Sequence, residues 1–73
     1  MLSKNEFTKE LAKNLKKARV EKGISQEELA DKAGVYRTYI GHIENSRYSP
    51  SSYILYKLTK ALRIPFSSIF PEN

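Results

Sequence analysis

The sequence predicts a single all-α domain over residues 1–73 with five helical segments, and three observations lead to this fold class. Apolar residues recur at the three- and four-residue spacing of amphipathic helices, and no stretch alternates like a strand. Two Ser-x-x-Glu patterns and the glycines divide the chain into short helices. The 73 residues include no cysteine, so one small apolar core must stabilise the fold, and a dimer would enlarge that core.

The first two helices share the same start and stop signals. Ser3 and Ser25 are each followed three residues later by a glutamate, which forms the capping box that satisfies free backbone N–H groups at a helix start. Gly23 and Gly34 follow the last apolar positions and predict left-handed helix ends. The residues expected to face the core are Phe7, Leu11, Leu15 and Ala18 in the first helix, and Leu29, Ala30 and Ala33 in the second.

Three further helical segments are predicted after Gly34. The third helix spans residues 37–45 and leads into a polar loop, and a short turn over residues 66–70 ends the fold. Ser49 is the expected N-cap of the fourth helix, with Pro50 at the first helical position, where a missing N–H group is harmless. The residues expected to face the core are Ile40 and Ile43 in the third helix, and Ile54, Leu55, Leu58, Ala61 and Leu62 in the fourth.

Charge is distributed unevenly along the chain, whose net charge is +5. Residues 1–31 hold 7 Lys and Arg against 6 Asp and Glu, whereas residues 32–73 hold 6 against 2. Between Lys32 and Arg63 the only acidic residue is Glu44. A basic half with few acids suits a polyanion such as nucleic acid, and the alternative is a surface that only keeps the protein soluble.

The second and third predicted helices are joined by only three residues, Gly34, Val35 and Tyr36. This spacing is typical of a helix-turn-helix unit, whose second helix enters the major groove of DNA. The small side chain of Ala30 lets the two helices approach each other, and Val35 and Ile40 would fill the angle between them. The alternative is a plain helical hairpin, which also needs a turn glycine and apolar residues.

The outer face of the third predicted helix carries Arg37, Thr38, Gly41 and His42. An arginine offers a fork that matches O6 and N7 of guanine, and a threonine can bind a base edge or contact a thymine methyl group. Gly41 weakens the helix by about 1 kcal/mol relative to alanine. It fits a place where the backbone must approach DNA closely, and the alternative is that a glycine is merely tolerated there.

Five stretches of the chain match one known sequence pattern. They are LKKAR at residues 15–19, KGISQEELA at 22–30, AGV at 33–35, YIGHIEN at 39–45 and LTKAL at 58–62. Over residues 11–70 the chain thereby resembles the lambdoid-repressor (XRE-type) helix-turn-helix family. The run Arg37-Thr38-Tyr39-Ile40 is most similar to the controller proteins of restriction–modification systems, although phage and plasmid repressors vary in the same helix. The resemblance implies a five-helix, lambda-repressor-like DNA-binding domain and a dimeric regulator of transcription.

The resemblance also implies which side chains contact a double-stranded DNA operator. Those that would read bases are Arg37, Thr38, His42 and Tyr36. Those that would contact phosphates are Gln26, Tyr39, Asn45, Arg47 and Tyr48. Gln26 would do so with its amide and with the N-terminus of the second helix. For His42 the alternative is plain exposure to solvent.

The family pattern pairs the position of Arg19 with that of Glu44. Such a pair would explain why the basic half retains one acid, because a neutralised carboxylate does not repel DNA. The alternative for Arg19 is a phosphate contact. The family usually has glycine where Ser46 and Arg63 stand, so Asn45 or Ser46 must take the left-handed conformation at the end of the third helix.

An aromatic surface near the end of the sequence is the predicted dimer interface. Tyr53 and Tyr56 lie on the flanks of the fourth helix, outside its apolar stripe. An isologous dimer built on this surface would place two recognition helices about 34 Å apart on a pseudo-palindromic operator. The residues assigned to it are Tyr53, Tyr56, Phe66, Ile69 and Phe70. The alternative for the tyrosines is exposure on a monomer. Burial in the core is the expected place for Phe7, Phe66 and Phe70 as single residues, beside the assignment of Phe66 and Phe70 to this surface.

Two classes of function fit these features. The first is a sequence-specific transcriptional regulator, for which the operator position and a contact with RNA polymerase would decide between activation and repression. The second is a protein-interaction module such as an antitoxin or an antirepressor. Enzymatic activity is not expected, because the sequence shows no paired carboxylates, no nucleophile with a base and no Gly-rich phosphate loop. No cofactor is expected either, and His42 is a poor metal ligand in a chain without cysteine or a second histidine.

The predicted location is the cytoplasm, in association with the nucleoid through DNA. The longest apolar run is far short of a membrane span, and the first residues lack the apolar segment of a secretory signal. A membrane partner is therefore not expected.

Overall fold

Four α-helices and one 3-10 turn make up the protein, as seen in a computed structural model that describes residues 2–71. The elements are α1 (Lys4–Glu21), α2 (Gln26–Ala33), α3 (Arg37–Glu44), α4 (Ser52–Leu62) and η1 (Phe66–Ile69). The all-α prediction is confirmed for these residues, but the fifth segment is a single 3-10 turn rather than an α-helix. Phe70, which precedes Pro71, is extended (φ −78°, ψ 143°), as a residue before proline prefers, and this ends the segment after one turn.

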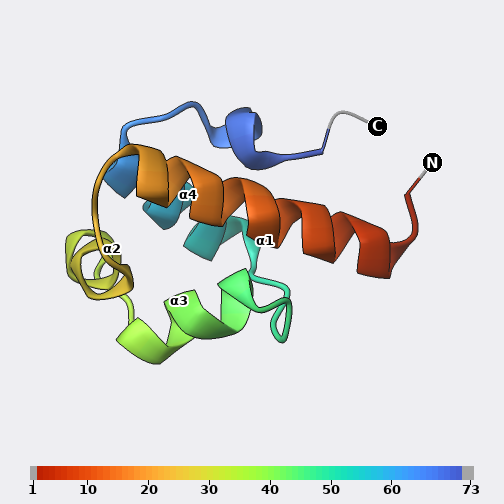
Figure 1. Cartoon of the computed structure of the whole chain (residues 1–73), viewed down its shortest axis with the longest axis horizontal. Helices are drawn as coiled ribbons and strands as arrows, with labels where there is room; N and C mark the ends of the chain where they lie inside the picture. The colour runs from red at the N-terminus through yellow and green to blue at the C-terminus, as the bar shows by residue number, and fades with distance from the viewer. Residues whose placement is uncertain (1, 72–73) are drawn as a thin grey trace.

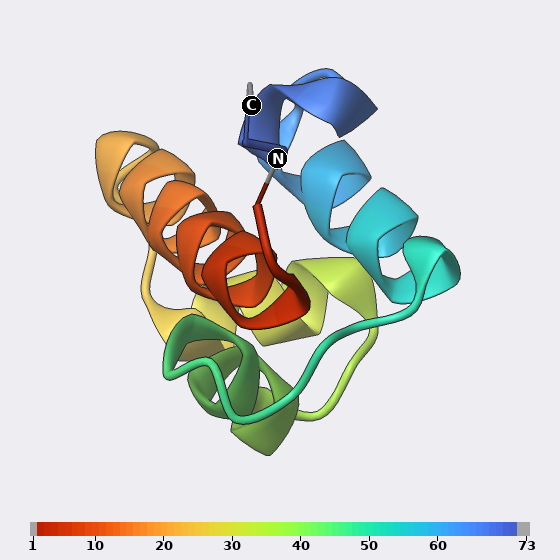
Figure 2. The ribbon, with the colours of Figure 1, turned by 90° about the vertical axis from the view of Figure 1, so that its right-hand side faces the viewer.

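α1 runs through the middle of the molecule, with α3 on one side of it and the C-terminal segment on the other (Figure 1). α2 packs against both α3 and α4, while η1 packs against both α1 and α4. Figure 2 shows α1 and α4 on either side of the molecule, with α2 and α3 below them. None of the helices within residues 2–71 is long and apolar enough to cross a membrane.

Both predicted capping boxes are present. Ser3 Oγ accepts a hydrogen bond from the Glu6 N–H group at 3.1 Å, and the Ser3 N–H group donates to a Glu6 carboxylate oxygen at 3.0 Å. The same reciprocal pair joins Ser25 and Glu28, at 3.0 and 2.9 Å. Hydrogen bonds from the serine backbone and then from the serine hydroxyl lower the pKa of each glutamate below its usual value.

Acid should weaken the two capping boxes. Because the folded pKa of Glu6 and of Glu28 lies below 4.5, each carboxylate stabilises the fold above that pH and loses its contribution as the pH falls through the lower folded pKa. We expect Glu6→Gln/Glu28→Gln to reduce the drop in melting temperature between about pH 6 and about pH 3, measured by circular dichroism. Glu10→Gln, outside both boxes on the exposed side of α1, is the control. A double variant that melts with the parent's pH dependence would contradict the assignment.

The predicted start of α4 is wrong by two residues. Ser51 is the N-cap, with its hydroxyl accepting a hydrogen bond from the Ile54 N–H group at 3.2 Å, and the helix begins at Ser52. Ser49 therefore does not cap the helix, and Pro50 lies before the cap instead of at the first helical position. Either serine can accept such a bond. The choice of Ser51 leaves Pro50 outside the helix, where its ring is buried.

The core is formed by the apolar faces of all four helices and by η1. Ala18, Ile54 and Ala61 lie half-buried at its edge. α3 contributes Ile40 and Ile43, which share one face of the helix, so the remaining faces of α3 point away from the core. The buried apolar residues are Leu11, Ala12, Leu15, Leu29, Ala30, Ala33, Ile40, Ile43, Leu55, Leu58, Leu62 and Ile69.

The three phenylalanines lie at the rim of the core rather than inside it. Phe7 is 38% and Phe66 39% exposed, so their predicted burial is wrong, and Phe70 is half-buried. The Phe70 ring contacts the other two, with centroid distances of 6.1 Å to Phe7 and 5.1 Å to Phe66. Phe7 belongs to the first turns of α1, which extend beyond α3 (Figure 1).

Four helix ends have a residue in the left-handed conformation. Gly23 (φ 71°) follows α1 and Gly34 (φ 69°) follows α2, as predicted. Ser46 (φ 61°) follows α3, and Arg63 (φ 59°) follows α4, the two positions where the sequence departs from glycine in the pattern that it resembles. Of the two candidates after α3, Ser46 takes the left-handed conformation, whereas Asn45 has φ −95°. Side chains with a Cβ are strained in this region by about 1–2 kcal/mol.

Relieving this strain should stabilise the fold. We expect Ser46→Gly and Arg63→Gly each to raise the free energy of unfolding by about 1 kcal/mol, measured by urea denaturation. The control is Lys60→Gly in the last turn of α4, which should lower that free energy by about 1 kcal/mol, because glycine is a poor residue inside a helix. Destabilisation by glycine at all three positions would contradict the prediction.

Candidate nucleic-acid interface

The turn between α2 and α3 has the predicted geometry. Gly34 adopts the left-handed conformation that reverses the chain, and the Val35 N–H group donates to the Ala30 carbonyl oxygen at 3.0 Å. Val35 is half-buried and Ile40 fully buried in the angle between the helices. From α4, Lys57 Nζ donates to the Gly34 carbonyl oxygen at 3.2 Å. The turn is thus held to α2 through Ala30 and to α4 through Lys57.

The face of α3 opposite the core is open. Arg37, Thr38 and His42 are exposed there, and the Arg37 side chain keeps 70% of its accessible surface. Tyr36, at the helix N-cap, is 80% exposed. Within residues 2–71 no element packs over this face. The four side chains predicted to read bases therefore stand together on a surface that a broad ligand such as a duplex can reach.

Gly41 lies on α3 where the fold itself leaves room for a side chain. A Cβ at this position would meet Gln26 Oε1 at 3.9 Å, which is ordinary van der Waals contact. The backbone there is helical and needs no glycine. Packing within the protein therefore gives no reason for the glycine, which leaves close approach to a ligand or simple tolerance.

A contact that the sequence did not predict joins Arg37 to α2. Arg37 Nη1 lies 3.6 Å from Glu27 Oε2, and the Glu27 side chain is 65% exposed. An ion pair so exposed is worth about 0–1 kcal/mol and is easily broken. The pairing does not lock Arg37, and it places the guanidinium next to the N-terminus of α2. Nothing in the local spacing of the two residues indicated it.

Arg19 and Glu44 form a bidentate, largely buried ion pair. Arg19 Nε lies 2.7 Å from one carboxylate oxygen of Glu44, and Arg19 Nη2 donates to the other at 3.0 Å. The side chains are only 11% and 2% exposed. Arg19 Nη1 also donates to the Ile24 carbonyl oxygen at 2.8 Å. The hydrogen bonds to Glu44 raise the pKa of Arg19, although its burial opposes this. The pair ties α1 to the end of α3.

Gln26 completes this network. Its Nε2 donates to Glu44 Oε1 at 3.0 Å, so part of the amide that was expected to hold a phosphate is used inside the protein. An amide nitrogen has two N–H groups, and the second remains for an outside acceptor. Gln26 is also the first residue of α2, so its backbone stands at the helix N-terminus. The predicted phosphate contact is thus confined to the second N–H group and the backbone.

The other residues expected to contact phosphates flank the end of α3. Tyr39 of α3 stacks on Tyr48 of the following loop, with ring centroids 5.3 Å apart and planes 8° from parallel. Tyr39 is 36% exposed, and Tyr48 is half-buried. Asn45 and Arg47 are exposed. The stack holds the loop against α3.

The residues assigned to a dimer surface do not all lie on the surface. Ile69 is 1% exposed and belongs to the core of its own chain, so its assignment to an accessible interface is wrong. η1 turns this side chain inward between α1 and α4. The remaining members are exposed by 66% (Tyr53), 49% (Tyr56) and 39% (Phe66), whereas Phe70 is half-buried.

Lysines accompany the two tyrosines of α4. Lys57 Nζ lies 5.3 Å from the centroid of the Tyr53 ring, and Lys60 Nζ lies 5.6 Å from that of Tyr56. Lys60 also donates to Tyr56 Oη at 3.3 Å. The exposed aromatic surface of α4 is therefore bordered by positive charge.

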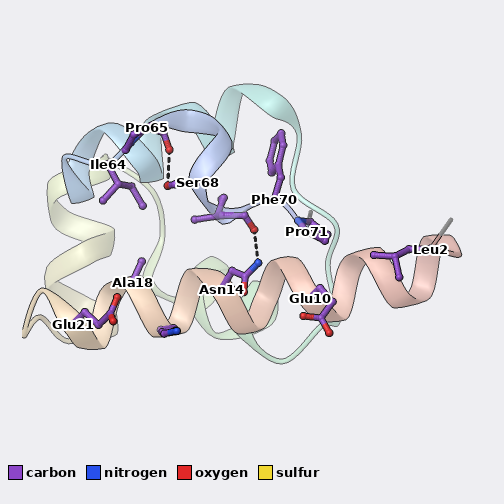
Figure 3. Close-up of a pocket in the computed structure, with 12 residues that line it drawn as sticks. Leu2, Glu10, Asn14, Ala18, Glu21, Ile64, Pro65, Ser68, Phe70 and Pro71 are labelled. Carbon is purple, nitrogen blue, oxygen red and sulfur yellow. Dashed lines mark hydrogen bonds between the residues drawn. The ribbon is translucent and has the colours of Figure 1, made fainter. Parts of the chain in front are cut away.

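A groove of about 880 Å³ lies between α1 and the C-terminal segment (Figure 3). Asn14 Nδ2 donates to the Ile69 carbonyl oxygen at 2.9 Å and ties the segment to α1. The lining includes the charged residues Glu10, Lys17 and Glu21 beside apolar ones. In Figure 1 the C-terminal segment and α3 lie on opposite sides of α1, so this groove is remote from the open face of α3.

The chain is similar in sequence and in structure to known repressor and controller proteins. The immunity repressor protein of Bacillus phage phi105 is 37% identical over 63 residues, which cover 86% of this chain but only 44% of the repressor. The restriction–modification controller protein C.AhdI from Aeromonas hydrophila superposes with a TM-score of 0.84 at 33% identity, over 86% of this chain and 96% of C.AhdI.

A further solved structure contains DNA. It is the tetramer of the controller protein C.Esp1396I in complex with its natural 35-base-pair operator, and it matches with a TM-score of 0.78 at 33% identity, over 88% of this chain and 82% of that one. The HTH_3 profile, described as helix-turn-helix, matches residues 15–69, which include the α2–turn–α3 unit and all residues of the open face of α3. On these grounds the chain belongs to the HTH_3 (XRE-type) helix-turn-helix family.

Proposed function

We propose that this chain is a sequence-specific regulator of transcription that binds a pseudo-palindromic DNA operator as a dimer. The observation that carries the proposal is the open face of α3. Arg37 and Thr38 project from a helix whose opposite face is buried, in the position where a helix-turn-helix unit presents its recognition helix. The likeness to a phage immunity repressor and to two restriction–modification controller proteins supports the same function.

In this proposal α3 lies in the major groove and Arg37 binds O6 and N7 of a guanine. Thr38 reaches a neighbouring base edge or a thymine methyl group, with His42 one turn further and Tyr36 at the helix start. Phosphate contacts hold the helix in register without reading sequence. The net charge of +5 favours the approach to DNA, and the neutralised Glu44 does not oppose it. The phosphate contacts are assigned to Gln26, Tyr39, Asn45, Arg47 and Tyr48.

The dimer is proposed to form through the exposed aromatic surface of α4 and η1. This surface comprises Tyr53, Tyr56, Phe66 and the exposed part of Phe70. An isologous contact would relate the two copies by a two-fold axis and set their α3 helices about 34 Å apart, which is one turn of DNA. The operator would then share that symmetry.

The test is selection of bound duplexes from a random pool, followed by binding measurements over a range of salt concentrations. The proposal expects one enriched pseudo-palindromic motif, bound with an affinity that falls steeply with salt as counterions are released. No enriched motif, together with a salt-insensitive complex with a protein, would indicate an interaction module such as an antitoxin or an antirepressor. Sedimentation that shows only monomers at micromolar concentration, with and without the selected duplex, would exclude the dimer.

The direction of regulation follows from where the operator lies. An operator that overlaps a promoter would block RNA polymerase, whereas one placed upstream would let the bound protein contact polymerase and recruit it. In either case the protein would act on the nucleoid, within the cytoplasm.

A further inference from the structure

A second, smaller groove lies where the first turns of α1 meet the loop after α3. Its volume is about 410 Å³. Its walls include Lys4, Thr8 and Lys9 of α1 and Ser46, Arg47 and Ser49 of the loop. We refer to it as the Lys4–Arg47 groove. It is separate from the larger groove beside the C-terminal segment, with which it shares no lining residue.

The Lys4–Arg47 groove concentrates positive charge from two elements. Lys4 and Lys9 of α1 face the same groove as Arg47 of the loop, and among its lining residues there is no aspartate or glutamate. Glu6, the acid nearest to Lys4 in sequence, does not line the groove; it is held in the capping box by the Ser3 N–H group, and its charge offsets part of that of Lys9. Three cations in one groove repel one another unless an anion enters between them. Hydroxyl groups on the loop wall add donors of the kind that phosphate oxygens accept.

The loop wall of this groove is attached to the recognition helix. The Arg47 N–H group donates to the His42 carbonyl oxygen at 2.9 Å, and the Ser46 N–H group donates to that of Ile43 at 3.1 Å. The stacked ring of Tyr48 adds a contact with Tyr39 of α3. When α3 lies in a major groove, one phosphate backbone of the DNA borders that groove near the C-terminal end of α3. This DNA backbone then passes the loop that follows α3.

We propose that the Lys4–Arg47 groove binds a phosphate of the operator backbone, so that α1 adds to DNA affinity from outside the helix-turn-helix unit. This inference rests on the proposed function. It gives a role to Lys4 and Lys9, which lie outside the residues 15–69 that the family profile matches. Because a phosphate contact carries no base information, the groove raises affinity for every duplex by the same factor.

The test is Lys4→Gln/Lys9→Gln, measured by fluorescence anisotropy with the selected operator and with a scrambled duplex at several salt concentrations. We expect the slope of log affinity against log salt to become shallower by about 1 to 2 units. The affinities for both duplexes should fall several-fold by the same factor, so that the preference for the operator is unchanged. Both lysines are exposed, so the fold should be retained, which circular dichroism checks.

The matched control is Lys13→Gln/Lys17→Gln. It also removes two positive charges from α1, but neither lysine lines the Lys4–Arg47 groove, and Lys17 lines the larger groove beside the C-terminal segment. We expect this variant to keep the parent's salt slope. An equal change in both double variants would show a general effect of net charge and overturn the proposal, as would an unchanged slope in Lys4→Gln/Lys9→Gln.

Single uncharged methylphosphonates in the operator locate the contact. We expect one substituted phosphate to weaken the parent several-fold and the Lys4→Gln/Lys9→Gln variant much less. Absence of any such phosphate would overturn the proposal even if the slopes differ. A parent chain that binds no duplex at all would overturn the proposed function and this inference together, whereas failure of the groove alone leaves the effect of Arg37→Ala on base preference intact.

Discussion

Replacing Arg37 with alanine should weaken binding to the selected operator by about 1–3 kcal/mol and relax the preference at one base pair. The reason is geometric. The Arg37 side chain is 70% exposed on the open face of α3, and its only ion-pair partner among residues 2–71 is an exposed carboxylate 3.6 Å away. The same exposure means that the fold loses little, within about 0.5 kcal/mol of unfolding free energy. Gel shifts with the operator and with its single-base variants measure both effects.

Arg47→Ala is the control for Arg37→Ala. It removes another exposed side chain of the same charge, but from the loop where a phosphate contact is expected. We expect it to lower affinity for operator and scrambled duplexes alike and to leave the base preference unchanged. Operator binding that is unaffected by Arg37→Ala, or a preference that stays intact in both variants, would show that the base-reading side chain has been assigned wrongly.

Removing the cation of the buried ion pair should have the largest effect on stability. Arg19→Met leaves the Glu44 carboxylate, 2% exposed, with Gln26 as its remaining hydrogen-bond donor. Breaking a buried pair in this way costs about 3–5 kcal/mol, because an uncompensated charge stays in the interior. A small domain is often stable by only about 5 kcal/mol, so the variant should keep about 0–2 kcal/mol of unfolding free energy. Urea denaturation followed by circular dichroism measures the loss.

The double variant Arg19→Met/Glu44→Leu separates charge burial from packing. It removes both charges and fills the space with apolar side chains, an exchange that is often neutral or stabilising. We therefore expect it to regain most of the stability lost in Arg19→Met. If both variants were equally unstable, the loss would come from the methylene packing of Arg19 or from its bond to the Ile24 carbonyl oxygen. A loss below about 1 kcal/mol in Arg19→Met would mean that the pair behaves as an exposed one.

Features of the fold that depend on neighbours in sequence could be predicted. The capping boxes at Ser3 and Ser25 need only a glutamate three residues later, and Gly34 needs only its own freedom to take positive φ. The inward positions of Ile40 and Ile43 follow from helical periodicity. With α3 placed by these features, its outward side chains followed directly.

Features of the fold that depend on residues distant in sequence could not be predicted from local patterns. Ser49 and Ser51 are equally good caps, and the burial of Pro50 was not visible in the sequence. Ile69 and Phe66 are close neighbours with similar side chains, yet the single turn of η1 buries one and exposes the other.

The candidate site likewise has contacts that local sequence patterns do not predict. Arg19 and Glu44 were paired by resemblance to a family, not by spacing, because they lie on different helices. The bond from Gln26 to Glu44 and the contact of Arg37 with Glu27 depend on how α2 sits against α3, which no local pattern encodes. The groove that Lys4 and Lys9 share with Arg47 depends on how α1 meets the loop after α3, which no local pattern encodes either.

The network of Arg19, Glu44 and Gln26 has a consequence for kinetics. Together with the ring of Tyr48 on Tyr39, it holds α3 against its neighbours before any duplex arrives. Association then requires little ordering of the protein, so the entropic penalty is small and the encounter rate depends on diffusion and long-range attraction. Operators of different quality would consequently differ mainly in residence time, since related complexes vary far more in how fast they dissociate than in how fast they form.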